Sequence, residues 1–296
     1  MRISIIIPTL NGAATLPALL SAVDRSRGGH EIELIAIDSG SRDDSVALLE
    51  AAGATVLDLG GARFGHASAR NRAASHATGD VLLFMTQDVE PVGDAWLAPL
   101  LAAFDDATVA GAFGRQIPRG ASPEEAFMVA TNYPDRPRTM TAATHGAGFG
   151  PGATLFSNAF GAMRWSAWER LPFPDIVMSE DQAWALEALR AGHTIRYVPG
   201  AAVYHGHRLS LGRAFRRNFD SGSSLEQLGL TGGVWSAGLA HLARELASIG
   251  REHGPIAASH AAVYEMARMA GFQLGRMEKA LPRGIARRLG EAPRGE

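Results

Sequence analysis

Residues 79–90 contain the feature that most constrains the fold, a short apolar run that stops abruptly at polar side chains. Positions 81–85 read Val-Leu-Leu-Phe-Met, and Thr86, Gln87 and Asp88 follow. A continuous apolar run of this length, bounded by turn-forming residues, is typical of a strand buried on both faces of a parallel sheet. Ligands of such sheets bind outside the carboxyl ends of the strands. Asp88 is therefore expected either in a ligand site or at the cap of the next helix.

The same pattern recurs through the first half of the chain. Further apolar strands are predicted at residues 3–7, 33–38 and 55–59, with helical patterns between them. Strands that alternate with helices of 10 to 15 residues indicate βαβ units. We predict an α/β fold, a Rossmann-like, mostly parallel sheet flanked by helices. Two strand ends then bring Asp38 and Asp88 to the same edge of the sheet.

The second half of the chain is less regular. The sequence predicts a helix at residues 95–104, strands at 109–116, 156–163, 195–198 and 202–204, and a helix that begins after Ser179 as its N-cap. Residues 117–155 form a long connection with a helical island at 123–130, and such connections are usually functional loops or lids. From residue 209 onward the pattern is helical, including a helix at residues 258–279. We therefore expect a domain at 1–208 and a helical extension at 209–296, which contacts an acceptor, a membrane or a second copy.

Composition narrows the cellular setting. The chain has no cysteine, so disulfides and thiolate metal sites are excluded. No window holds 18 consecutive apolar residues, and the N-terminal apolar run is too short for a secretory leader, so we expect a soluble cytoplasmic protein. Residues 1–203 carry 15 basic and 22 acidic residues, whereas residues 204–296 carry 13 basic and 8 acidic. The basic tail is either a solvated helical face or a contact with an anionic surface, such as the inner face of a membrane.

Several short motifs together suggest a family. They are Pro8-Thr9-Leu10-Asn11-Gly12, Ile37-Asp38-Ser39-Gly40-Ser41, Ala69-Arg70-Asn71, Thr86-Gln87-Asp88, Ser179-Glu180-Asp181-Gln182 and His205. In this order and spacing, over about residues 3–220, they resemble family 2 glycosyltransferases with the GT-A fold. His66 and the final His205-Gly206-His207 are similar to the bacterial rhamnosyltransferase branch. The resemblance implies inverting transfer of a sugar from a nucleotide-diphosphate donor to a glycan or lipid-linked acceptor in cell-surface polysaccharide synthesis, with Mg²⁺ or Mn²⁺.

The resemblance assigns donor-binding roles to the strand ends. It implies that Asp38 binds the base of the donor, in a pocket lined by Pro8, Thr9, Asn11 and Ser41. The alternative for Asp38 is that it stabilises its own turn. Gln87 and Asp88 come at the position of the family's Asp-X-Asp element, and Asp88 matches the acid that binds metal and diphosphate. Thr86 replaces the first acid of that element, so one carboxylate is missing.

Three further side chains are placed by the resemblance. His205 matches a position where some relatives supply a third metal ligand, a role open to a neutral imidazole; the alternative is an ordinary surface or core histidine, and His207 is a weaker candidate. Arg70 could approach the diphosphate as a fixed cation, or form a surface salt bridge. His66 shares that loop with its role open.

The base for the acceptor hydroxyl is expected in the Glu180-Asp181 pair. The resemblance places it at Asp181, and Glu180 is either the base instead or the residue that orients Asp181. A carboxylate in the first turn of a helix is expected to stay ionised, because the helix N-terminus favours the anion. Simple helix capping is the alternative.

Two other function classes remain open. A nucleotidyltransferase also uses a doubly wound sheet, but it needs a glycine-rich basic loop after the first strand, and residues 8–12 contain no Lys or Arg. A sugar-nucleotide-binding protein without catalysis needs no base, which the Glu180-Asp181 pair argues against. A nucleic-acid partner is not expected, since no basic stripe with interleaved aromatics is present.

Overall fold

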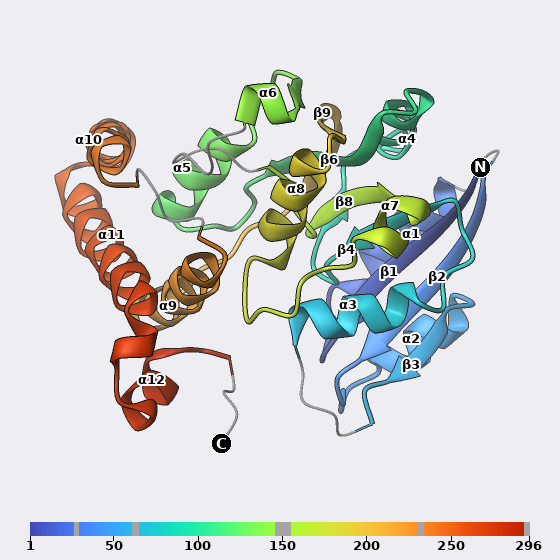
Figure 1. Ribbon diagram of the computed structural model, residues 1–296, viewed down its shortest axis with the longest axis horizontal. Helices are drawn as coiled ribbons and strands as arrows, with labels where there is room; N and C mark the ends of the chain where they lie inside the picture. Colours follow the sequence, from blue (N-terminus) through green and yellow to red (C-terminus); the bar gives the residue numbers. More distant parts are fainter. Residues whose placement is uncertain (27–29, 61–64, 146–154, 230–233, 293–296) are drawn as a thin grey trace.

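A computed structural model describes residues 1–26, 30–60, 65–145, 155–229 and 234–292 of the chain. Its centre is a nine-stranded sheet in the order β3-β2-β1-β4-β8-β6-β9-β5, with β7 paired to β9 (Figure 1). The strands are β1 Arg2–Thr9, β2 Glu31–Asp38, β3 Thr55–Asp58, β4 Val81–Met85, β5 Glu90–Pro91, β6 Val109–Ile117, β7 Arg138–Met140, β8 Phe160–Arg164 and β9 Thr194–Tyr204. The predicted α/β class is confirmed.

Helices cover both faces of the sheet. The helices are α1 Leu16–Arg25, α2 Ser45–Ala51, α3 His66–Ala74, α4 Ala98–Ala102, α5 Pro123–Asn132, α6 Ala142–His145, α7 Trp165–Arg170, α8 Glu180–Arg190, α9 Leu211–Gln227, α10 Val234–His253, α11 Pro255–Arg276 and α12 Arg283–Leu289, with single 3-10 turns at Ala103–Asp105 and Glu278–Ala280. Alternate residues of β1 enter two separate cores: Ile5 packs with α1 and α4, and Ile6 packs with α3 and α8. This alternation explains why the central strands are apolar throughout.

The first four strands are parallel and contain the switch in strand order. β1 pairs with β2 on one side and with β4 on the other. Connections on the two sides of β1 leave in opposite directions, so a crevice opens at the carboxyl ends of β1 and β4. Thr9, Asp38 and the segment after Met85 all lie at this edge, as the sequence predicts.

The other half of the sheet is mixed, so antiparallel pairs join the predicted parallel ones. β8 runs antiparallel to both β4 and β6, and β9 runs parallel to β6 but antiparallel to β5 and β7. Two boundaries also change. β8 begins at Phe160 rather than at 156, and the two predicted strands at 195–204 are a single strand whose register against β6 shifts between Gly114 and Arg115.

The long connection after β6 is partly regular. α5, β7 and α6 lie within residues 117–155, and residues 146–154 of this predicted loop lie outside the described part of the chain. The predicted N-cap at Ser179 is wrong in its detail. Ser179 precedes α8 but adopts a left-handed backbone with φ of 66°, and its side chain makes no capping bond.

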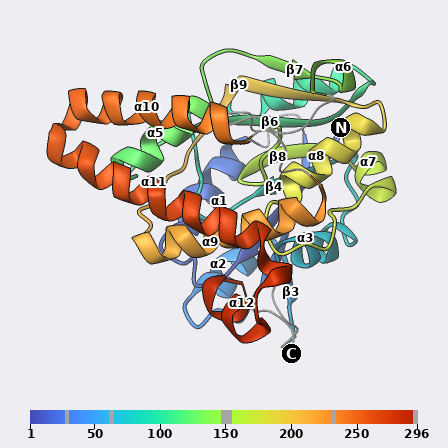
Figure 2. The same cartoon turned by 60° about the vertical axis from the view of Figure 1, so that its left-hand side comes forward.

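Helices α9 to α12 lie together on the left of Figure 1, with β1–β3 on the right, and Figure 2 brings these helices forward. The predicted helix at 258–279 corresponds to α11 and the short turn after it. α9 and α11 approach so closely that a Cβ on Gly275 would lie 2.0 Å from the carbonyl oxygen of Phe219. Glycine is therefore required at this crossing. Within the described residues, the helices include none that is both long and apolar enough to cross a membrane.

Candidate active site

The loops after β1 and β4 are fixed to each other by Gln87. Its side-chain amide donates to the carbonyl of Leu10 and its amide oxygen accepts from the backbone of Leu10, both at 2.9 Å. Gly12 makes room for this contact, because a Cβ there would lie 2.5 Å from the Gln87 oxygen. Gln87, expected to bind the donor, thus also fixes the start of the turn that carries Asp88.

The residues predicted to bind the base do come together, in a hydrogen-bonded pair of turns. Asp38 is buried and accepts from the backbone amides of Gly40 and Ser41, each at 2.9 Å, and from the Ser41 hydroxyl at 2.5 Å. The Ser41 oxygen in turn accepts from the backbone amide of Asn11 at 2.8 Å. Thr9 is buried beside half-buried Pro8. Asp38 therefore stabilises its turn, the alternative raised from the sequence, at the position where a base is expected to bind.

A carboxylate and two imidazoles converge beyond this edge. Asp88 Oδ1 lies 3.7 Å from His205 Nε2, and Asp88 Oδ2 lies 3.8 Å from His207 Nδ1. One potential ligand atom from each residue lies within 4.8 Å of the other two. The cause is the pairing of β5 with β9, which places Glu90 opposite Tyr204 and so brings the residues before one strand and after the other together.

The donor chemistry of this cluster fits a divalent metal. Burial lowers the pKa of His205 to about 4, so its imidazole is neutral at pH 7 and able to act as a ligand. His205 Nδ1 lies 2.7 Å from the side-chain oxygen of Gln116, which can only accept; Nδ1 therefore carries the proton and Nε2 is left facing Asp88. Thr86, which stands where the family has an acid, is not part of the cluster. His207, the weaker candidate from the sequence, belongs to the cluster.

Gln116 is a residue that sequence reasoning missed. It is 5 % exposed at the end of β6 and its amide donates to the Ser157 hydroxyl at 2.9 Å. An outer hydrogen bond of this kind fixes the tautomer and the orientation of a ligating histidine. The available signal was a polar residue at the end of an otherwise buried apolar strand.

Arg70 and Glu180 form a buried ion pair. Arg70 Nη1 lies 2.8 Å from Glu180 Oε1, and their side chains are each 6 % exposed. The same nitrogen also donates to the carbonyl of His66 at 3.3 Å, and Glu180 Oε1 accepts from the Asn158 side chain at 3.1 Å. The pair is not the surface salt bridge considered as an alternative for Arg70. A buried charge needs such partners, because desolvation strongly disfavours an isolated ion.

Asp181 is half-buried beside this pair. Its Oδ2 accepts from the backbone amide of Asn158 at 3.1 Å, and its Oδ1 accepts from that of Gln182 at 2.8 Å. Burial and the negative charge of Glu180 together raise the pKa of Asp181 to about 6. With this pKa Asp181 is still mostly ionised at pH 7, as expected for a carboxylate in the first turn of a helix, but it holds a proton more readily than an ordinary carboxylate. A pKa near the working pH suits a general base, which must be ionised yet able to accept a proton.

A second cation, Arg217 on α9, was also missed. Burial lowers the pKa of His66 and of His205, and the positive charge of Arg217 acts in the same direction on both. Arg217 lies one helical turn before Ser221, whose hydroxyl contacts that of Ser179 at 3.3 Å. Arg217 therefore adds positive charge on the side of α9 that faces the candidate site.

Two solved structures with a similar fold were determined in complex with nucleotide sugars. The mannosyltransferase PcManGT from Pyrobaculum calidifontis, solved with GDP-Man and Mn²⁺, aligns with a TM-score of 0.63 at 18 % identity, over 94 % of this chain and 86 % of that one. TarS 1-349 from S. aureus, solved with UDP-GlcNAc, aligns with a TM-score of 0.55 at 14 % identity, over 95 % and 92 %. The fold is therefore GT-A.

Sequence relatives identify the family. The model of glycosyl transferase family 2 matches residues 4–159. The O-antigen chain rhamnosyltransferase RfbN of Salmonella typhimurium is 29 % identical over 97 % of this chain and 93 % of its own length. WbaN of Salmonella anatum, also an O-antigen chain rhamnosyltransferase, is 28 % identical over 96 % and 92 %. The chain belongs to glycosyltransferase family 2.

Proposed function

We propose that the protein transfers a deoxyhexose, with inversion, from a nucleotide-diphosphate sugar to a glycan carried on a lipid, at the inner face of a membrane. The names of the two Salmonella relatives support the sugar class and the polysaccharide product. Over 96 residues the chain is 34 % identical to an undecaprenyl-phosphate 4-deoxy-4-formamido-L-arabinose transferase, and this supports a lipid-linked acceptor. Residues 1–208 would form the catalytic domain and residues 209–296 the extension.

One observation carries the proposal: two consecutive residues join the proposed base to the cluster of Asp88, His205 and His207. The backbone of Asn158 donates to Asp181, and the hydroxyl of Ser157 accepts from Gln116, which holds His205. A base and a leaving-group site must be held at a fixed separation for in-line displacement. A protein that only bound sugar nucleotides would need no such link.

The chemistry assigns one role to each group. Asp181 takes the proton of the acceptor hydroxyl. The hydroxyl oxygen then bonds to the anomeric carbon, while the bond from that carbon to the diphosphate oxygen breaks. Glu180, fixed by Arg70, orients Asp181 and helps keep its pKa high. Pro8, Thr9, Asn11, Asp38 and Ser41 receive the base of the donor. Arg217 and His66 contact the diphosphate. The guanidinium of Arg70 is less available for this contact, because it is buried and paired with Glu180.

Asp88, His205 and His207 would hold the divalent metal. The metal, when bound, neutralises charge on the diphosphate as it leaves. Mg²⁺ prefers an all-oxygen shell, whereas imidazole ligands suit transition metals. We propose Mn²⁺ rather than Mg²⁺ on this ground, and the Mn²⁺ in the PcManGT structure supports the choice.

Thermal-shift measurements with a panel of dTDP-, UDP- and GDP-sugars test the donor class. A donor stabilises only the folded state, so one nucleotide series should raise Tm in the presence of Mn²⁺ and lose most of that effect in chelator. The selected donor is then incubated with lipid-linked glycan, and NMR of the product should show inverted anomeric configuration. If no sugar nucleotide raises Tm, or if the product retains configuration, the proposal is wrong.

Gln116→Leu tests the outer contact on His205. Loss of the hydrogen bond frees the imidazole to rotate and removes the group that fixes its tautomer, so Mn²⁺ affinity should fall about 10- to 100-fold. Titration calorimetry with Mn²⁺ measures this without substrate. Gln227→Leu, on an exposed part of α9, is the matched control and should bind Mn²⁺ like the parent. Equal affinity in the Gln116 variant would remove Gln116 from the site.

A further inference from the structure

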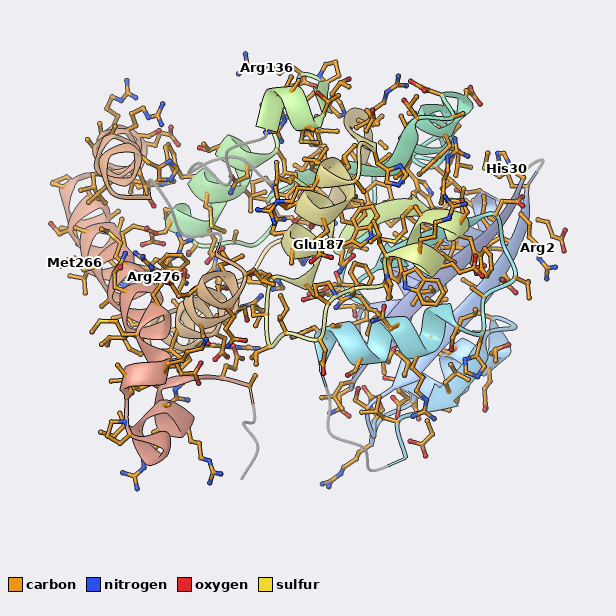
Figure 3. The ribbon with its side chains drawn as sticks, in the orientation of Figure 1. Arg2, His30, Arg136, Glu187, Met266 and Arg276 are labelled. Atoms are coloured by element: carbon orange, nitrogen blue, oxygen red, sulfur yellow. The ribbon has the colours of Figure 1, made fainter. Side chains whose placement is uncertain are left out.

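One face of α11 is largely apolar and exposed, with Ser259 as an exposed polar residue within it and with Met277 directly after the last residue of the helix. Ile256 is 87 % exposed, Val263 47 %, Met266 58 % and Met277 56 %, and Ala270 is exposed between them. Their spacing of seven, three, four and seven residues places all five on one face of a helix about 33 Å long. In Figure 3, Met266 lies on the outer side of α11, away from the sheet. We call these five residues the outer face of α11.

None of these residues is charged, and neither is Ser259 between them, unlike an ordinary solvated helix surface. The opposite side of α11 is already occupied. Gly271 and Gly275 pack against the backbone of α9, and Tyr264 is buried with its hydroxyl bonded to Glu125 of α5 at 2.6 Å. A contiguous apolar surface of this kind marks an interaction site.

A basic segment follows directly at the end of this face. Residues 279–290 read Lys-Ala-Leu-Pro-Arg-Gly-Ile-Ala-Arg-Arg-Leu-Gly, with four cations and no acid. Lys279 and Arg288 are exposed, and Ile285 is 48 % exposed among them. Apolar side chains next to clustered cations favour the interface of a bilayer that contains anionic lipid.

We propose that the outer face of α11 and the basic segment 279–290 dock together on an anionic lipid bilayer, lying in its interface without crossing it. A second copy of the chain would offer apolar surface but would bring another positive segment. An anionic bilayer supplies both the apolar environment and the negative charge.

Docking there would also orient the connection after β6. α11 holds α5 through His260, an exposed residue beside the outer face whose Nδ1 lies 2.8 Å from Glu124 Oε1, and through the buried Tyr264 on Glu125. α5 belongs to the long connection that we expect to meet the acceptor. This consequence rests on the proposed function, since it assumes a lipid-linked acceptor, whereas lipid docking itself does not.

Vesicle flotation with the full chain tests the proposal. The protein should float with vesicles of phosphatidylcholine and phosphatidylglycerol at a ratio of about 7 to 3, and stay behind with phosphatidylcholine alone. Each cation near an anionic surface contributes about fivefold, so Lys279→Gln with Arg288→Gln should weaken partitioning about 25-fold. Met266→Glu should weaken it at least as much. Arg190→Glu, an exposed charge at the end of α8, is the control and should float like the parent.

Three results would overturn the proposal. The first is that the protein does not float with vesicles, and the second is that it floats equally well with neutral vesicles. The third is a dimer in light scattering that Met266→Glu dissociates, because a second copy of the chain would then be the occupant. Donor binding measured in solution is unaffected by any of these results. Failure of lipid docking is thereby distinguished from failure of the glycosyltransferase assignment.

Discussion

Asp181→Asn should lower the rate of sugar transfer by about 10²- to 10⁴-fold, the range that a positioned general base contributes. The amide has nearly the size of the carboxylate but cannot take a proton from the acceptor hydroxyl. Donor affinity should stay within a few-fold of the parent, because Asp181 contacts α8 and the 155–158 segment rather than the edge where the nucleotide is expected. Steady-state transfer assays and calorimetry with the donor measure the two quantities separately.

The pH profile gives an independent readout of the same residue. Burial and Glu180 raise the pKa of Asp181 to about 6, so the base becomes protonated and transfer falls as the pH drops through about 6. Asp181→Asn should lose this acidic limb. Glu187→Gln, farther along α8 and labelled in Figure 3, removes a carboxylate from the same helix and should retain both rate and pH profile. An Asp181 variant with the parent's rate would exclude it as the base.

The parts of the site that follow from local pattern could be predicted from the sequence. An apolar run that ends at a carboxylate shows where a buried strand stops, and parallel strands end at a shared edge. Asp38 and Asp88 were placed by this reasoning. Glu180 and Asp181 were placed by the resemblance, and the structure puts them at the first turn of α8.

The remaining features depend on contacts between distant segments. His207 joins Asp88 because β5 pairs with β9, and a two-residue strand such as β5 leaves no periodic signal in the sequence. Gln116 meets His205 across 89 positions, and Arg70 meets Glu180 across 110. The antiparallel direction of β8 was missed for a similar reason, because strand direction is set by pairing partners rather than by composition.

Backbone strain marks the same region. Asn11 and Ser179 are non-glycine residues with positive φ, 49° and 66°. Asn11 lies in the turn beside Ser41, and Ser179 directly precedes the Glu180-Asp181 pair. Such conformations cost about 1–3 kcal/mol and persist where surrounding contacts fix them, often at functional sites. Asn is among the non-glycine residues that adopt this conformation most readily, whereas nothing in the residue type marks Ser179.

Asp88→Ala should lower donor affinity in Mn²⁺ by about 10²-fold or more and should abolish the difference between Mn²⁺ and chelator. The variant loses the only carboxylate of the Asp88, His205 and His207 cluster and leaves two imidazoles, which hold a divalent cation less well. Calorimetric titrations of donor, with and without Mn²⁺, measure the effect. Asp94→Asn changes an exposed carboxylate paired with Arg25 and serves as the control.

His207→Ala separates a three-residue metal site from a two-residue one. If His207 is a ligand, Mn²⁺ binding without donor should weaken about 10-fold or more in this variant, with transfer restored in part at high Mn²⁺. His76→Ala, an exposed histidine on the turn after α3, should bind Mn²⁺ like the parent. Unchanged Mn²⁺ affinity in both Asp88→Ala and His207→Ala would place the metal elsewhere. Absence of Mn²⁺ binding in the parent itself would instead leave the cation chemistry at the diphosphate to Arg217, as in a transfer that needs no metal.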